Sequence, residues 1–367
     1  MELTQKRVRK QLERMKPVMN GCSMDWARKG QDVLGRCCTG AITKRFGSKR
    51  VPFRFLRLPD STPGTGSRGT HFVSPRRGLC LWGLGIRQGI WSSFGCRNRR
   101  GGSCPAYRLA PEHPFPAGLQ DAMTAYRACL QEAGPVVFCG ESAGGGMIYA
   151  LCMKARQEEL PLPAGLIGIS AWTDLTASGR SYAENRDRDP SMTWERLDFF
   201  ASCYTQCRDL PLVSPLFGDL TGFPPSLLFV GGDEIMLDDS RLLHEKLMAS
   251  GSPSTLVVAP GLWHAYILYV LKERREDWTD CCHFAGDCAG GRKIKIQFWQ
   301  KALAFVLKSG IISKLICGSP VSLRRRTSAA GKNCMEKSRS WSKRARLEIV
   351  ISLKRVSRVR IPPSPPY

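Results

Sequence analysis

A serine within a glycine-rich turn is the feature of this sequence with the clearest chemical meaning. The segment Gly140-Glu141-Ser142-Ala143-Gly144 has the form G-x-S-x-G. An apolar strand is predicted before it at residues 135–139, and a helix is predicted after it at residues 147–156. A turn of this form between a strand and a helix holds the serine hydroxyl above the edge of the sheet. We therefore expect Ser142 to be a nucleophile, with the amide of Ala143 facing the negative charge that develops on a substrate oxygen.

A serine hydroxyl needs a general base, and the base needs an acid to orient it. Asp233 follows an apolar run at residues 226–230, and His264 follows the next run at residues 255–259. Both residues are thus expected at the carboxyl ends of strands, where ligands bind in parallel sheets. The predicted catalytic residues are Ser142, Asp233 and His264. Glu234, next to Asp233, is the alternative candidate for the acid.

The elements that must position these residues alternate between strand and helix. Short apolar runs bounded by turn residues predict strands at 135–139, 166–172, 226–230 and 255–259, and helices are predicted at 119–130, 147–156 and 239–249. This alternation predicts an α/β fold with a mostly parallel sheet flanked by helices. The polar stretch 178–209 is too long for a plain connection and is expected to form a lid or a helical insertion.

The central part of the chain resembles a known family. The segment from Tyr107 to Ala117, the turn around Ser142, the Asp233 and His264 segments and Ser214-Pro215-Leu216 are similar to the hormone-sensitive-lipase-like esterases, the fold-3 group of the α/β-hydrolases. The order serine, acid, histidine along the chain agrees with that fold. The resemblance implies a carboxylic ester hydrolase with a preference for short acyl chains and with no cofactor. It also implies structural roles for Arg108, Glu112 and His113.

One motif of that family is missing. Its members carry His-Gly-Gly-Gly about thirty residues before the Tyr107 segment, and those glycine amides complete the oxyanion hole. At that position this chain reads Ser74-Pro75-Arg76-Arg77-Gly78. Proline has no amide hydrogen to donate, and losing one oxyanion donor costs on the order of 100-fold to 1000-fold in rate. A catalytically inactive remnant of such a hydrolase is therefore the main alternative function, and the sheet is expected to be incomplete at its amino-terminal strands and carboxyl-terminal helix.

Four segments are predicted along the chain. Residues 1–58 are expected to form an amino-terminal helical cap segment, because Val8, Leu12, Met15 and Met19 recur at helical spacing. A helix packed on the core is favoured over one that binds a membrane surface, and the stretch from Met15 to Gly35 is similar to the helical cap of some members of that family. Residues 59–105 are irregular, 106–278 form the hydrolase core, and 279–367 form a basic tail of low order. Residues 60–105 and 279–367 have an irregular sequence that is rich in Arg, Trp and Cys, which suggests the hypothesis that these segments are translated out of frame. Sequencing the gene tests that hypothesis.

The net charge of +24 does not describe the core. Residues 107–286 carry 14 basic and 23 acidic side chains, so the excess of basic residues lies at the two ends. A basic protein that binds nucleic acid is a second alternative, but the chain lacks the aromatic interleaving that would favour it. The sixteen cysteines show no paired spacing typical of zinc sites, so no metal is expected, and the chain is expected to be reduced and cytoplasmic. No apolar run reaches the roughly 18 residues that a membrane-spanning helix needs.

Overall fold

A computed structural model describes residues 4–23, 53–54, 71–73, 102–103, 107–131, 134–269 and 271–288. Residue contacts divide the chain into two compact units, 1–319 and 320–367. All described residues belong to the first unit. The motif position around Pro75 and most of the basic ends lie outside the described residues.

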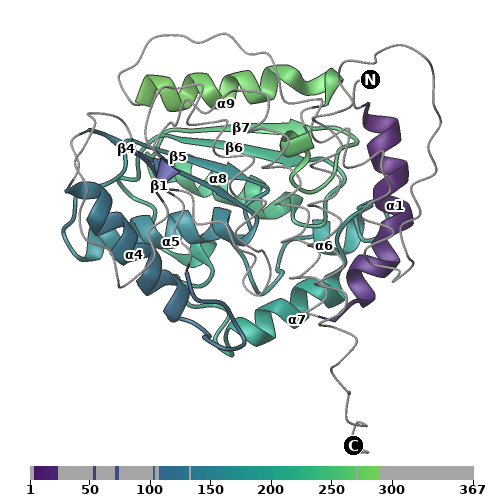
Figure 1. Cartoon of the computed structure of the whole chain (residues 1–367), viewed down its shortest axis with the longest axis horizontal. Coiled ribbons are helices and arrows are strands. Elements are labelled where there is room, and N and C mark those ends of the chain that lie inside the picture. Colours follow the sequence, from purple (N-terminus) through teal and green to yellow (C-terminus); the bar gives the residue numbers. More distant parts are fainter. Residues whose placement is uncertain are drawn as a thin grey trace, which may run out of the picture. The chain divides into compact units, whose positions relative to one another are not determined.

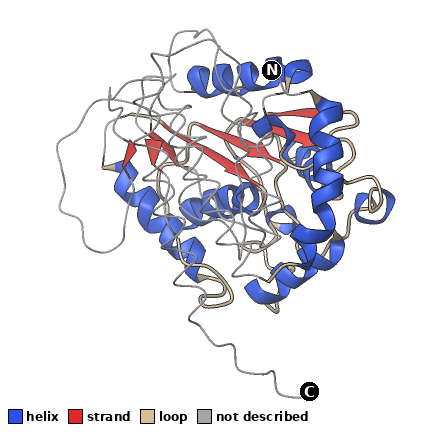
Figure 2. Cartoon of the chain, turned by 45° about the vertical axis from the view of Figure 1, so that its right-hand side comes forward, coloured by secondary structure: helices blue, strands red, loops and turns tan. Residues whose placement is uncertain are grey.

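The described strands form one parallel sheet (Figure 2). Its order is β1-β3-β2-β4-β5-β6-β7. The strands are β1 (Phe53–Arg54), β2 (His71–Val73), β3 (Gly102–Ser103), β4 (Val136–Glu141), β5 (Gly165–Ile169), β6 (Ser226–Gly231) and β7 (Ser254–Ala259). The predicted α/β class with a parallel sheet is therefore confirmed. The first three strands are two or three residues long, whereas the strands that lead to the predicted site residues are full length.

Helices cover both faces of this sheet (Figure 1). They are α1 (Gln5–Gly21), α4 (Ala117–Leu130), α5 (Ala143–Gln157), α6 (Ser181–Glu184), α7 (Trp194–Tyr204), α8 (Leu237–Ala249) and α9 (Arg275–Cys288). Short 3₁₀ turns occupy Pro215–Phe217, Tyr266–Tyr269 and Lys272–Arg274. The helices and strands predicted between residues 119 and 259 are all present, with ends that differ by a few residues. No helix in the described ranges is both long and apolar enough to cross a membrane.

The core lies in two layers because side chains alternate along each strand. On β4, Phe138 packs with α4 and α5, while Val137 and Cys139 pack on the opposite face with α9 and α1. The strands β5 and β6 show the same alternation. Since both faces of the sheet are covered, β4, β5 and β6 are buried along their whole length, as is typical of central strands in a parallel sheet.

Two of the predicted segments can be compared with these elements. The helix predicted from the spacing of Val8, Leu12, Met15 and Met19 is present as α1. Val8, Leu12 and Met15 are buried in the core, whereas Met19 is 39% exposed. The boundary predicted at residue 278 lies inside α9, because Cys281, Cys282 and Ala285 continue the buried face of that helix. The folded core therefore extends at least to Cys288. The predicted insertion at 178–209 contains α6 and α7.

Candidate active site

The turn between β4 and α5 has the geometry of a nucleophile elbow. Ser142 adopts φ 56° and ψ −126°, a left-handed conformation that is strained for a residue with a side chain. Its amide donates to the carbonyl of Ile169 at 2.9 Å, and its carbonyl accepts from the amide of Trp172 at 2.9 Å. The last residue of β5 and the chain that follows it thus hold the strained turn in place.

The glycines of the elbow are required by close backbone approach. A Cβ atom on Gly140 would lie 2.2 Å from the carbonyl oxygen of Gly144, and one on Gly146 would lie 2.0 Å from the carbonyl oxygen of Trp172. Real Cβ atoms do not approach other atoms so closely, so neither position accepts a larger residue without movement of the backbone. These contacts explain in physical terms why the elbow needs small residues around Ser142.

The histidine follows β7 and is oriented by a buried carboxylate. His264 Nδ1 lies 3.0 Å from Glu234 Oε2, and the other oxygen of Glu234 accepts from the amide of Gly231 at 3.1 Å. The Glu234 side chain is fully buried, whereas that of His264 is 11% exposed. Burial raises the pKa of Glu234 above its ordinary value, and the hydrogen bond from His264 opposes that rise. This arrangement leaves Nε2 of His264 free of the acid and able to accept a proton.

Asp233, the acid predicted from the sequence, does not contact His264 in this structure. Its carboxylate accepts from Arg9 at 2.7 Å and from Arg188 at 2.6 Å. The prediction is therefore wrong on geometry, and its alternative, Glu234, occupies the position of the acid. The two carboxylates are adjacent in the sequence, but they contact different partners: Asp233 binds two arginines, and Glu234 binds His264.

A hydroxyl that sequence reasoning missed links the parts of the site. Ser170 follows β5 directly, is fully buried and has φ 47°. Its Oγ accepts from the amide of Ala265 at 2.9 Å, and the same hydroxyl opposes the rise that burial causes in the pKa of Glu234. Ser170 therefore connects the histidine loop to the acid. No sequence signal separated it from the many other serines.

Ser142, Glu234 and His264 all follow strands at the same edge of the sheet. The residues pair in parallel register from Glu141 with Ile169 to Gly231 with Ala259, so the carboxyl ends of β4 to β7 are aligned. The amide of Ala143 begins α5, where the helix dipole favours negative charge. Together these groups can perform acyl transfer: a nucleophile, a base with its acid, and one oxyanion donor.

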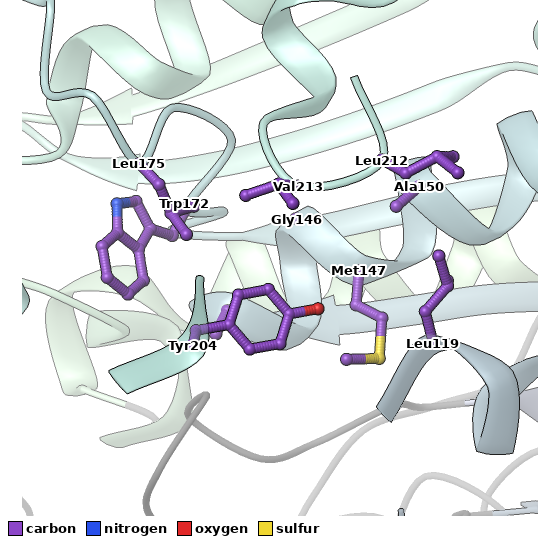
Figure 3. A pocket seen from close by; sticks show the side chains of 10 residues that line it. Leu119, Gly146, Met147, Ala150, Trp172, Leu175, Tyr204, Leu212 and Val213 are labelled. Carbon is purple, nitrogen blue, oxygen red and sulfur yellow. The ribbon is translucent and has the colours of Figure 1, made fainter. Parts of the chain in front are cut away.

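An apolar pocket adjoins the elbow (Figure 3). One face of α5 supplies residues three to four positions apart, and α4, α7 and the loops after β5 and before Pro215 supply the rest. The lining residues are Leu119, Ala143, Gly146, Met147, Ala150, Trp172, Leu175, Tyr204, Leu212 and Val213. Burial raises the pKa of the Tyr204 phenol, so this ring stays neutral. The lining therefore carries no charged group and suits an uncharged, apolar part of a ligand.

The other residues with predicted roles have structural contacts. Arg108 forms an ion pair with Asp121 at 2.9 Å, and the amide of His113 donates to the carbonyl of Leu109 at 2.8 Å. His244 on α8, for which no role is predicted, has its Nδ1 2.9 Å from the hydroxyl of Ser254 on β7. The described residues contain no cluster of three or more potential metal ligands.

Comparisons with known proteins agree with this fold. A family model described as the alpha/beta hydrolase fold matches residues 103–268. An acetyl-hydrolase from Streptomyces hygroscopicus is 39% identical over 176 residues, covering 46% of this chain and 59% of that protein. An esterase from Acinetobacter venetianus is 32% identical over 188 residues, covering 49% of this chain and 62% of that protein. The chain thus spans about three fifths of the length of these relatives.

Solved structures extend the comparison over more of the chain. A mutant of the esterase E40 is 33% identical with a TM-score of 0.56, covering 59% of this chain and 75% of that one. A hormone-sensitive lipase from a metagenome library is 27% identical with a TM-score of 0.65, covering 78% of this chain and 99% of that one. EstE5, in a crystal soaked with p-nitrophenyl butyrate, is 27% identical with a TM-score of 0.62, covering 76% of this chain and 98% of that one.

Proposed function

This chain belongs to the α/β-hydrolase family that includes the hormone-sensitive-lipase-like esterases, and on that premise we propose that it is a serine carboxylic ester hydrolase. The observation that carries the proposal is the buried Glu234–His264 pair, at the same sheet edge as the strained elbow of Ser142. The esterases and acetyl-hydrolase among the relatives support an ester as the substrate.

The proposed reaction is acyl transfer to water through a covalent intermediate. The Oγ of Ser142 attacks the ester carbonyl while Nε2 of His264 accepts the hydroxyl proton. Glu234 stabilises the imidazolium that forms, and the Ala143 amide donates to the oxyanion. His264 then protonates the leaving alcohol, and water activated by the same base releases the acid and restores Ser142.

We further propose that the apolar pocket receives the acyl chain. Ala143 lines the pocket and also supplies the oxyanion donor, so a group bound there lies beside the carbonyl under attack. Met147 and Leu119 lie at the end of the pocket opposite Trp172 and Leu175 (Figure 3). These side chains close that side of the pocket, which supports a short acyl chain over a long one.

The test is hydrolysis of p-nitrophenyl acetate and p-nitrophenyl butyrate by the full chain. The proposal expects turnover that is saturable and that falls to background in the Ser142→Ala variant. Correctly folded protein without turnover on any short ester would contradict it. That outcome would favour the inactive remnant, for which the specific observation is Pro75 at the position of the missing glycine donors.

A further inference from the structure

The carboxylate of Asp233 lies at the meeting point of three segments that are far apart in the sequence. Arg9 comes from α1, 224 residues away along the chain, and its Nη1 donates to Asp233 Oδ2 at 2.7 Å. Arg188 follows α6, and its Nη2 donates to Asp233 Oδ1 at 2.6 Å. The Nη2 of Arg9 also donates to the carbonyl of Arg188 at 2.7 Å. Asp233 is 8% exposed at its side chain, so both ion pairs are partly shielded from solvent.

The same helix also holds the loop that carries the histidine. Arg9 Nη1 donates to the carbonyl of Gly261 at 3.1 Å, and the side-chain amide of Gln5 donates to that carbonyl at 2.9 Å. Gly261 has φ 69° and lies three residues before His264. The amide of Asp233 in turn donates to the carbonyl of Leu262 at 2.9 Å. The guanidinium of Arg9 therefore contacts both the loop after β6, which carries Glu234, and the loop after β7, which carries His264.

The segment after α6 also contacts the loop that carries Glu234. The side-chain amide of Asn185 donates to the carbonyls of Gly232 and Glu234 at 3.2 and 2.9 Å. Asp189 Oδ2 accepts from the amide of Ile235 at 3.1 Å. The ammonium group of Lys16 on α1 donates to the carbonyl of Asp189 at 2.5 Å. Side chains from outside the sheet thus fix the backbone on both sides of Glu234. The segment that supplies Asn185 and Asp189 follows α6, which lies close to α1 (Figure 1).

We propose that Arg9, Asp233 and Arg188 form a positioning network that aligns Glu234 with His264, so that α1 is part of the catalytic apparatus although it contributes no catalytic residue. This inference rests on the proposed function. Asp233, excluded as the acid by its contacts, acts as the anchor for the loop on which the acid lies. The network acts on catalysis by holding the loops after β6 and β7 in register. It also places two positive charges and one negative charge next to Glu234.

The first test compares substitutions of two arginines of α1. Arg9→Met removes the contacts to Asp233, Gly261 and Arg188, whereas Arg14→Met changes an exposed arginine of the same helix. With p-nitrophenyl butyrate as the probe, Arg9→Met is expected to lower kcat by about 10-fold or more with KM within about 2-fold, because misalignment affects the transition state more than substrate binding. Arg14→Met is expected to leave both constants unchanged. The double variant Arg9→Met/Asp233→Asn is expected to lose less than the product of the two single losses, because the residues act as one unit.

The second test is a readout that a merely structural role would not move. The charged groups that face the site are Arg9 from α1, Arg188 and Asp189 from the segment after α6, and Asp233 and Glu234 from the loop after β6. Arg9→Met removes a positive charge and favours a protonated base, so the acidic limb of the kcat/KM profile is expected to move to higher pH. Asp233→Asn removes a negative charge and is expected to move that limb to lower pH. Each shift should be roughly half a pH unit at low ionic strength, where screening is weak.

Arg9→Lys keeps the experiment decisive if Arg9→Met fails to fold. Lysine keeps the charge but cannot make all the contacts of the guanidinium, so kcat is expected to fall while the acidic limb stays in place. The inference is overturned if the Arg9 variants fold and keep the wild-type kcat, or if Arg9→Met and Asp233→Asn shift the limb in the same direction. A wild-type chain that hydrolyses no ester refutes the proposed function instead, so the two failures are distinguishable.

Discussion

The assignment of the acid to Glu234, and not to Asp233, gives the sharpest prediction of this structure. Glu234→Gln keeps the size of the side chain but removes the negative charge that faces His264 Nδ1 at 3.0 Å. The amide can present its NH₂ group to that nitrogen and favour the wrong tautomer of the imidazole. For a comparable change of the acid in a serine protease, kcat falls about 10⁴-fold. We expect a loss of about 10³-fold to 10⁴-fold here, since Glu234 is fully buried and water does not replace the lost charge.

The matched variant is Asp233→Asn, which makes the same chemical change one residue earlier. Its carboxylate is bound to two arginines and does not contact the base, so we expect kcat to fall by about 10-fold to 100-fold. The assay is the initial rate of p-nitrophenyl butyrate hydrolysis, measured across pH 5 to 9 on samples with matching circular dichroism spectra. If Asp233→Asn loses about 10⁴-fold while Glu234→Gln retains most of its activity, the assignment of the acid from this geometry is refuted.

Three further predictions follow from the pocket, the elbow and the buried acid. Met147→Ala is expected to shift the preferred p-nitrophenyl ester from acetate or butyrate toward hexanoate or octanoate, whereas Met153→Ala, equally buried on α5 but outside the pocket, is expected to leave the preference unchanged. Gly146→Ala places a Cβ 2.0 Å from the carbonyl of Trp172, so denaturant titration should show a loss of at least 2 kcal/mol, roughly the scale of overpacking in a core. The folded-state pKa of Glu234 lies above its ordinary value, so its ionised form opposes folding once the pH rises through that pKa. Glu234→Gln should therefore raise Tm at pH 8 but not at pH 4. A Tm difference that is independent of pH would contradict this reasoning.

The elements around the site were predictable because their signals are local. Apolar runs bounded by turn residues marked β4 to β7, and the elbow around Ser142 combined a strand, a glycine-rich turn and a helix. His264 was predicted from its place after β7. The family match begins at residue 103, close to the predicted start of the core at residue 106.

The acid was not predictable from local signals because Asp233 and Glu234 are adjacent after the same strand. The choice between them is made by Arg9 and Arg188, which reach Asp233 from distant segments. The role of Ser170 depends in the same way on contacts across the sheet edge. The extent of α9 was missed because two cysteines and an alanine form its buried face beyond Trp278, and these residues give only a weak apolar pattern.

Some predictions stay untested by this structure. The hypothesis of out-of-frame segments and the replacement of the glycine donors at Pro75 concern residues that lie mostly outside the described ranges. The alternative of nucleic-acid binding depends on the basic ends, which lie mostly outside them as well. The cytoplasmic location also stays a prediction.

Covalent labelling of Ser142 tests the central claim most directly. The full chain is incubated with diethyl p-nitrophenyl phosphate, which phosphorylates serine nucleophiles that an adjacent base activates. The account predicts one diethyl phosphoryl group per chain, located on Ser142 by peptide mass spectrometry, with esterase activity lost in proportion to labelling. Folded protein that stays unlabelled at Ser142, or a label on another residue that accounts for the loss of activity, would contradict the account.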